Sequence, residues 1–406
     1  MTNVLQGIRV VEVAEYVFAP AATAVLADWG AQVIKVEHAE RGDVVRSTTS
    51  WGVEPGIDGF TYVWEAFNRG KRSIGLDLTK PEAREILAEL IRGADVFVTN
   101  LMPRSRAKLG IDVEHVRAIN PRCIYGRATA YGPKGPEAAK GGFDGVTYWL
   151  RSGAGLSAMP DPEGELIPLP APAFGDSQTG MALAGGLVGA LFHRERTGEA
   201  PVVDCSLMAS GMWAMQAALV GANLKKVDML YNADRSSSSS PLTNHYRTSD
   251  GRWVALAMLQ GDRYWGDFCR LAGRPELAED QRFATVAARA EHNRECIREL
   301  DALFIEHPLE YWVELLSRQE GQWAIAEPVG ALNTDEQALA NGYLQTVDYG
   351  GGRRLNLVSS PVSFDEAAPV LRPAPGLGAD TEMVLHEDLE ISWERIIELK
   401  EIGAIN

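Results

Sequence analysis

Short apolar runs alternate with helical segments through the first third of the chain. The apolar runs predict buried strands, because they are short and separated by helical patterns. They cover residues 7–14, 31–37, 73–78, 95–100 and 122–130. Helices are predicted at residues 20–30 and from Pro81 to about Arg92. Strands separated by helices in this way are typical of a parallel sheet covered on both faces. We therefore predict an α/β fold with a Rossmann-like large domain.

A second pattern lies at residues 171–192, which are rich in glycine and alanine. From Met181 onward this stretch has no charged side chain and no clear polar face, which predicts a helix buried on all sides. Glycines inside a helix lower its stability, so we expect them where another backbone packs closely. This helix is predicted to lie at the centre of the fold.

Asp176, near the start of that helix, is the only ionised side chain between Glu165 and His193. One interpretation is a helix N-cap, in which the carboxylate accepts backbone N–H bonds. The other is a nucleophilic carboxylate, held ionised at the helix N-terminus with free N–H groups nearby to receive an oxyanion. The local sequence leaves both interpretations open.

Composition narrows the classes of partner. The 406 residues include 39 Lys and Arg against 55 Asp and Glu, a formal charge of −16, which argues against nucleic acid or an anionic membrane. The 46% hydrophobic and 23% charged residues are typical of a globular chain long enough for two domains. Four scattered cysteines without a CxxC pair predict neither disulfides nor zinc, and with no signal-peptide pattern they favour the cytoplasm.

Residues 205–224 are uncharged over 20 positions, which is long enough for a membrane span. Four polar residues within them favour instead a long buried or interface helix. These are Ser206, Ser210, Gln216 and Asn223.

The sequence also argues against several common chemistries. Glu37 closes the second predicted strand, where dinucleotide-binding domains keep a ribose-binding acid. The first strand-to-helix turn, residues 14–20, contains no glycine, so a pyrophosphate could not approach its backbone and NAD is not expected. No metal-binding histidine motif, triphosphate-binding loop or hydrolase elbow is present in the sequence.

Basic residues gather near the ends of predicted strands, where a phosphate-bearing ligand could use them. One group is Arg69, Lys71 and Arg72, and the other, after Asn100, is Arg104, Arg106 and Lys108. His38 lies just past a strand, where open α/β sheets bind ligands. Taken singly, each charge is as well explained by a solvated surface.

Several ordered motifs run along nearly the whole chain. They include NRGKRSIGLDL from Asn68, VFVTNLMPRSRAKLGI from Val96, KGGFDGV from Lys140 and FGDSQTGMALAGGL from Phe174. Together they resemble the class III CoA-transferases of the CaiB/BaiF type, which include formyl-CoA and carnitine CoA-transferases.

The resemblance implies site residues as well as an activity. Asp176 matches the nucleophile, which attacks an acyl-CoA thioester and passes through an aspartyl-CoA thioester before CoA moves to a carboxylic acid. Acyl-CoA and the acid are then substrates, with no metal and no permanently bound cofactor. Val17, Phe143 and Asp144 are implied to line the substrate pocket. The implied CoA-contacting positions are His38, Leu76, Asn100, Leu101, Lys108 and Lys140.

Two departures from the family pattern affect the expected substrate. Residues 17–19 read Val-Phe-Ala where the formyl-CoA enzymes have a glutamine, which favours a more apolar acyl group. Phe143 stands where racemases of the same fold carry a proton-transferring histidine. Transferase is therefore favoured over an α-methylacyl-CoA racemase. A non-catalytic CoA-binding protein remains an alternative if Asp176 is only a cap.

The resemblance further implies how the chain is organised. The expected parts are a large CoA-binding domain at residues 1–225, ending in the linker helix 205–224, a small α+β domain at 226–328, and a segment at 329–406 that returns to the large domain. An interlocked homodimer is implied. The serine run 236–240 corresponds to the loop that covers the aspartate in the formyl-CoA enzymes.

Overall fold

The computed structural model describes residues 3–47, 56–161, 163–230 and 234–406. It divides the chain into two compact units. The first consists of Met1–Leu156, Ile167–Leu230 and Thr334–Asn406, and the second of Ser157–Leu166 and Tyr231–Asn333. The segment Ser157–Leu166 thus belongs to the second unit, whereas the sequence predicts it in the large domain.

The first unit is built on a six-stranded sheet in the order β3-β2-β1-β4-β5-β6. All neighbouring strands are parallel, which confirms the predicted α/β class, and the order is that of doubly wound dinucleotide-binding folds. The strands are β1 (Arg9–Val13), β2 (Gln32–Glu37), β3 (Arg72–Gly75), β4 (Val96–Thr99), β5 (Ile124–Thr129) and β6 (Val202–Ser206).

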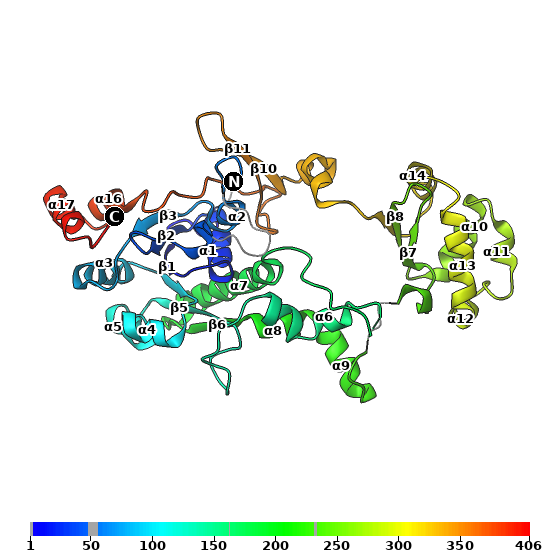
Figure 1. The fold of residues 1–406 in the computed structure, drawn as a ribbon, viewed down its shortest axis with the longest axis horizontal. Coiled ribbons are helices and arrows are strands. Elements are labelled where there is room, and N and C mark those ends of the chain that lie inside the picture. The colour runs from blue at the N-terminus through cyan, green and yellow to red at the C-terminus, as the bar shows by residue number, and fades with distance from the viewer. Residues whose placement is uncertain (1–2, 48–55, 162, 231–233) are drawn as a thin grey trace. The chain divides into compact units, whose positions relative to one another are not determined.

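Apolar helices cover both faces of this sheet. On one face α1 (Phe18–Asp28) and α7 (Phe174–Thr197) lie side by side, and their buried side chains form one core with β1, β4 and β5 (Figure 1). The other face is covered by α3 (Pro81–Arg92), α5 (Val113–Ile119) and α17 (Trp393–Glu401). The chain end returns to the sheet here, because Ile405 forms a bridge with Leu76 after β3.

Helix α7 confirms the predicted central helix but is not buried on all sides. Gly180 is at the contact with α1, where an added Cβ would lie 2.6 Å from the Ala21 Cβ. Gly185 and Gly189 instead meet nothing within 4 Å, and Phe192 is 67% exposed. The absence of charged residues from this helix therefore did not predict burial of all its faces within a single chain.

The predicted long helix at 205–224 is wrong. Cys205 and Ser206 end strand β6, where they pair with Ala128 and Thr129 of β5. Ser206 then caps α8 (Leu207–Ala214) by accepting from the Ala209 N–H at 3.1 Å, and α9 (Gln216–Lys225) follows after Met215. An uncharged sequence does not distinguish a strand end with a serine cap from a continuous helix.

The second unit packs helices on an antiparallel sheet in the order β7-β8-β9. Its strands are Thr243–Arg247, Trp253–Ala257 and Trp323–Ile325. Phe268, Phe304 and Trp312 are fully buried in its core. The helices are α10 (Gly261–Leu271), α11 (Pro275–Glu279), α12 (Val286–Glu291), α13 (Asn293–Phe304) and α14 (Leu309–Leu316). The serine run lies in this unit, and Ser238 donates to the Ser240 carbonyl at 3.2 Å.

Smaller elements complete the described part of the first unit. A hairpin of β10 (Leu344–Asp348) and β11 (Arg354–Val358) is antiparallel. The short helices are α2 (Tyr62–Asn68), α4 (Pro103–Leu109), α6 (Ala154–Ser157), α15 (Glu336–Ala340) and α16 (Thr381–Met383). Among the described residues, none of the helices combines the length and the apolar character that crossing a membrane requires.

Candidate active site

Asp176 is the third residue of α7 and is 8% exposed. The helix N-cap is Ala173, whose φ of 62° lies in the left-handed region and whose side chain caps nothing. No residue in the described ranges donates a hydrogen bond to the Asp176 carboxylate. The simple cap interpretation is therefore wrong, because the chain starts the helix without using this side chain.

Asp144 takes the capping role from a distant segment. Its carboxylate accepts the backbone N–H of Gly175 at 3.3 Å and that of Gly145 at 2.7 Å. The backbone N–H of Asp176 also stabilises its charged form. Burial still raises the pKa of Asp144, but these donors oppose that rise. Two carboxyl groups are thus neighbours, and only Asp144 has hydrogen-bond donors.

This asymmetry decides where the proton resides. Burial first, and the charge of Asp144 second, raise the pKa of Asp176 to about 8. A carboxyl group with this raised pKa favours the protonated form near neutral pH, whereas the sequence predicted an ionised Asp176. The expected free N–H groups are also absent from the first turn, because Phe174 donates to Ala171, Gly175 to Asp144 and Ser177 to Ala173.

Asp176 lines a pocket of largely apolar side chains, which we call the Asp176 pocket. Phe143 lies in its wall and contacts Tyr16 edge-to-face, with ring centroids 5.0 Å apart. Asn100, Leu101 and Lys140, all predicted from the sequence, lie in the same wall. The larger aliphatic and phenyl side chains of the lining are Phe18, Leu101, Met102, Phe143, Val146 and Leu207.

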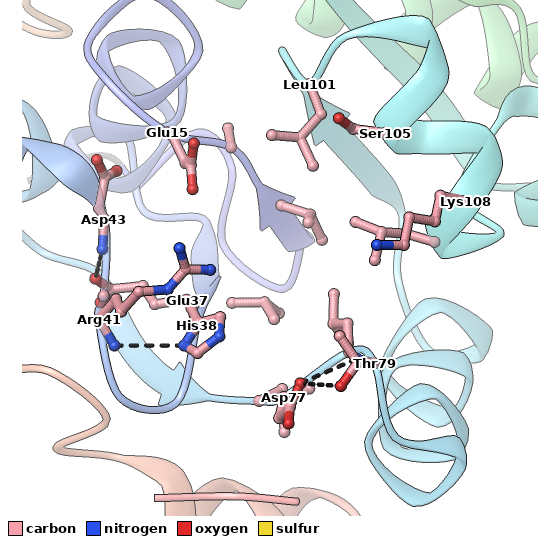
Figure 2. Close-up of a pocket in the computed structure, with 17 residues that line it drawn as sticks. Glu15, Glu37, His38, Arg41, Asp43, Asp77, Thr79, Leu101, Ser105 and Lys108 are labelled. Carbon is pink, nitrogen blue, oxygen red and sulfur yellow. Dashed lines mark hydrogen bonds between the residues drawn. The ribbon is translucent and has the colours of Figure 1, made fainter.

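A second pocket, the His38 pocket, opens at the carboxyl ends of β1, β2 and β3 (Figure 2). Doubly wound sheets bind ligands at this edge, where the strand order reverses between β1 and β4. His38, Leu76, Leu101 and Lys108 line it, as the sequence predicted for one ligand site. Figure 2 shows Arg41 and Lys108 on opposite sides of this pocket.

The two pockets share part of their walls. Glu15, Leu101 and Ser105 line both of them. A ligand that occupies both pockets must therefore pass these three residues. All six predicted CoA-contacting residues line one of these two pockets, and the predicted pocket residue Phe143 lies with Asp176. The six are His38, Leu76, Leu101, Lys108, Asn100 and Lys140.

The loop between β1 and α1 forms the partition and is held from both sides. The Asn100 amide accepts the Glu15 N–H at 3.0 Å and donates to the Glu15 carbonyl at 2.5 Å. On the other side, Asp43 accepts the N–H of Tyr16, whose φ of 63° lies in the left-handed region. The shape of both pockets thus depends on these backbone contacts.

A buried ion-pair network supports the same loop, and sequence reasoning missed it. Lys35 is 2.6 Å from Glu12 and 2.8 Å from Asp43, and it donates to the Ala14 carbonyl. Lys71 pairs with the other Glu12 oxygen at 2.8 Å. The sequence did contain a signal for this network. Glu12 lies inside the apolar strand β1 and Lys35 inside the apolar strand β2, and these opposite charges are register partners.

Comparisons with known proteins identify the family of this chain. The profile of CoA-transferase family III matches residues 5–381. The chain belongs to this family. It is 32% identical to a (R)-2-hydroxy-4-methylpentanoate CoA-transferase of Clostridioides difficile over 402 residues, 99% of each chain. It is 31% identical to a cinnamoyl-CoA:phenyllactate CoA-transferase of Clostridium sporogenes, covering 95% of this chain and 93% of that one.

A solved structure gives the same result. A CaiB/BaiF family protein from Brucella suis aligns with a TM-score of 0.80 at 27% identity, covering 94% of this chain and 98% of that one. The family III enzyme described here transfers CoA between an acyl-CoA and a carboxylic acid.

Two predicted site residues of this family III enzyme lie outside the pocket walls. Val17 is buried in an apolar cluster with Ala21 and Trp64. Asp144 lines neither pocket, and its carboxylate accepts the backbone N–H of Gly175 in α7. Lys140 lines the Asp176 pocket but is paired with Glu137 at 2.6 Å.

Most of the predicted phosphate-binding arginines and lysines form ion pairs within the fold, although Arg106 also lines the Asp176 pocket. Arg69 is paired with Asp28, Arg72 with Asp388, and Arg106 with Asp112. Lys71 is buried against Glu12. Lys108 is the member of these groups that lines the His38 pocket. Position at a strand end did not separate ligand-facing cations from cations that hold the chain together.

The acidic residue Glu37, which stands where a dinucleotide-binding domain keeps its ribose-binding acid, is also bound within the protein. Glu37 accepts from Arg46 Nε at 2.7 Å, from Arg46 Nη2 at 2.8 Å and from the Ser73 hydroxyl, so its carboxylate is already hydrogen-bonded. No group of three or more potential metal ligands occurs among the residues that the structure describes.

Proposed function

We propose that CoA transfer in this enzyme proceeds through a covalent CoA thioester on Asp176. The observation that supports this most is a buried carboxyl group without a hydrogen-bond donor, in a pocket that shares wall residues with a second, cation-bearing pocket. A carboxylate that attacks a thioester must reach its carbonyl carbon without competing contacts, and it must be shielded from water that would hydrolyse an anhydride.

The steps exchange one thioester for another. The Asp176 carboxylate attacks the donor thioester carbonyl, the C–S bond breaks, and a mixed anhydride and CoA thiolate form. The thiolate attacks the Asp176 carbonyl carbon, which releases the donor carboxylate and leaves the aspartyl-CoA thioester. The acceptor carboxylate repeats these steps in reverse order, so the new acyl-CoA leaves and Asp176 is regenerated. No ATP is required.

Stabilisation of the developing oxyanions falls to groups outside the first turn of α7. Gly141 and Gly142 line the Asp176 pocket, and their N–H groups donate to no acceptor within the described ranges. Backbone N–H groups of this kind stabilise tetrahedral intermediates when they are held in place. We assign them this role for the attack on either carbonyl.

CoA is proposed to bind across both pockets. Arg41 and Lys108 would attract its phosphates in the His38 pocket, which adjoins the Asp176 pocket where the thioester reacts. His38 accepts the backbone N–H groups of Glu40 and Arg41 at its Nδ1, which leaves Nε2 as the donor of the neutral ring. The first unit therefore carries CoA binding in this account.

The acyl group is proposed to be apolar. Phe143, Met102 and Val146 present hydrocarbon to the Asp176 pocket, and a wall of this kind favours branched or aryl side chains. The acids named in the two relatives above, 4-methylpentanoate with a 2-hydroxyl group and phenyllactate, have such side chains. Because Phe143 cannot carry a proton, the racemase alternative lacks one of its two acid/base groups.

An interlocked homodimer is proposed as the assembled form. Helices α8 and α9 expose large apolar side chains that a soluble monomer seldom leaves in contact with water. Trp213 is 72% exposed, and Val220 and Leu224 are exposed with it. We also propose a cytoplasmic location, which is consistent with the unpaired thiols of Cys123, Cys205, Cys269 and Cys296.

A transfer assay tests the proposed function directly. Purified protein is incubated with an acyl-CoA and a second carboxylic acid, without ATP, and new CoA thioesters are detected by mass spectrometry. Branched and aryl acids are expected to be better acceptors than formate or oxalate. Formation of no second thioester from any such pair, or free acid as the only product, would contradict the proposal.

A further inference from the structure

Glu15 lies on the partition between the two pockets and lines both of them. Its backbone is fixed, because the Asn100 side chain bonds to both the Glu15 N–H and the Glu15 carbonyl. The side chain is half-buried and lies at the His38 pocket in Figure 2. The scaffold therefore sets the backbone position from which the Glu15 side chain extends.

Four acidic residues line the His38 pocket, and three of them are already engaged. Glu37 is bound by Arg46, Asp43 by Lys35, and Asp77 by the Thr79 N–H and hydroxyl. The Glu15 carboxylate accepts no hydrogen bond from any residue in the described ranges. Burial first, and the charge of Asp43 second, raise the pKa of Glu15, whereas the charges of Lys35 and Arg41 lower it. Among these four acids, Glu15 is the one available to a ligand.

A carboxylate at this point would repel a phosphate, but it can accept hydrogen bonds from neutral N–H and O–H groups. If CoA places its phosphates near Arg41 and Lys108 and its thioester near Asp176, the pantetheine arm must cross the partition. That arm carries two amide N–H groups and one hydroxyl group, and it carries no charge. A carboxylate accepts such donors more strongly than a neutral acceptor does.

We propose that Glu15 accepts a hydrogen bond from the pantetheine arm of CoA as the arm passes between the two pockets. This inference rests on the proposed function, because it assumes that CoA spans both pockets. Glu15 is then a binding residue that also fixes the register of the coenzyme. Its charge keeps phosphates in the His38 pocket, and its hydrogen bond holds the arm so that the thioester reaches Asp176.

The direction in which CoA affinity changes when Glu15 is replaced distinguishes this role from a simple charge effect. CoA is an anion, so removing a carboxylate that only repels it would tighten binding. Loss of an accepted hydrogen bond weakens binding instead, by roughly tenfold or more for a charged acceptor. We expect CoA to bind Glu15→Ala about tenfold more weakly than the wild type in calorimetry, and Glu15→Gln by a smaller factor, because its amide oxygen still accepts.

Glu40→Gln is the matched control. It removes the same charge from an exposed position two residues after His38, and Glu40 lines neither pocket. CoA affinity should be unchanged or slightly higher. Thermal unfolding of all three variants checks the fold, since the Asn100 contacts involve only the Glu15 backbone.

Shortened thioesters locate the donor. With an acyl-pantetheine, which lacks the nucleotide, the loss of kcat/KM in Glu15→Ala should persist. With the thioester of ethanethiol, which has no donor, wild type and variant should be equal. Equal or tighter CoA binding by Glu15→Ala overturns this role alone. If wild-type protein binds no CoA, the proposed function itself is overturned, and the role of Glu15 with it.

Discussion

The carboxylates of Asp144 and Asp176 are neighbours with opposite surroundings. Asp144 accepts the Gly145 and Gly175 N–H groups, whereas Asp176 accepts none from the described residues. Because two buried like charges oppose each other, one of the pair keeps a proton, and Asp176 is the one with fewer reasons to ionise. The pKa of Asp176, raised to about 8, therefore favours a proton on this proposed nucleophile near neutral pH before substrate binds.

This relationship predicts a pH dependence. Burial and Asp144 raise the pKa of Asp176 to about 8 from 3.8, and only the ionised form attacks. The kcat/KM for acyl-CoA, which reports on the free enzyme, should rise with pH along a limb centred near 8. Asp144→Asn removes the neighbouring charge, which lowers the pKa of Asp176 and should move this limb to lower pH. An unmoved limb would show that Asp144 does not set it.

The contact between α1 and α7 predicts a difference between two glycines of the same helix. An added methyl group at Gly180 would meet Ala21 at 2.6 Å, so Gly180→Ala should destabilise the protein by about 1–3 kcal/mol. Gly185 has open space around it, and Gly185→Ala should be neutral or stabilising by up to about 1 kcal/mol through helix propensity. Denaturant titration measures both, and equal losses would contradict the packing argument.

Phe143 predicts that the enzyme does not racemise its substrate. Incubation with a 2-methylacyl-CoA in deuterated water should leave the α-hydrogen unexchanged, because the side chain at this position cannot transfer a proton. Nuclear magnetic resonance or mass spectrometry detects the exchange. Rapid incorporation of deuterium would instead favour the racemase alternative.

The exposed apolar side chains of α8 and α9 predict a stable homodimer. An interlocked pair cannot separate without unfolding, so dilution should not release folded monomer. Sedimentation velocity over a wide concentration range tests this. A folded monomer in rapid exchange with dimer would contradict the interlocked form.

Strand and helix positions in the sheet domain could be predicted from the sequence because apolar periodicity reports burial directly. The predicted strand at 31–37 is β2, and the helix from Pro81 to about Arg92 is α3 with those same bounds. The same pattern gave a wrong prediction for the uncharged segment 205–224, which contains the end of a strand as well as helices. Ser206 ends β6 and caps α8. A missing charge does not specify a backbone conformation.

The candidate site was predictable as a set of residues but not as a set of contacts. Motif resemblance identified Asp176, His38 and Lys108, which line the two pockets. It did not reveal that Glu15 lies between those pockets, since its only sequence signal is one acid in a turn. The ion-pair partners of Arg69 and Arg72 are distant in sequence, so local reading could not distinguish them from ligand-binding cations.

Covalent trapping at Asp176 tests the central claim most directly. Acyl-CoA donor followed by hydroxylamine should convert one aspartyl side chain to a hydroxamate, which peptide mass spectrometry locates at Asp176. The neighbouring Asp144 peptide is the internal control and should stay unlabelled. Asp176→Asn should lose the label and reduce transfer by many orders of magnitude while it still binds CoA, since an amide cannot form the anhydride. A label on any other residue, or wild-type turnover by the Asn variant, would contradict the account.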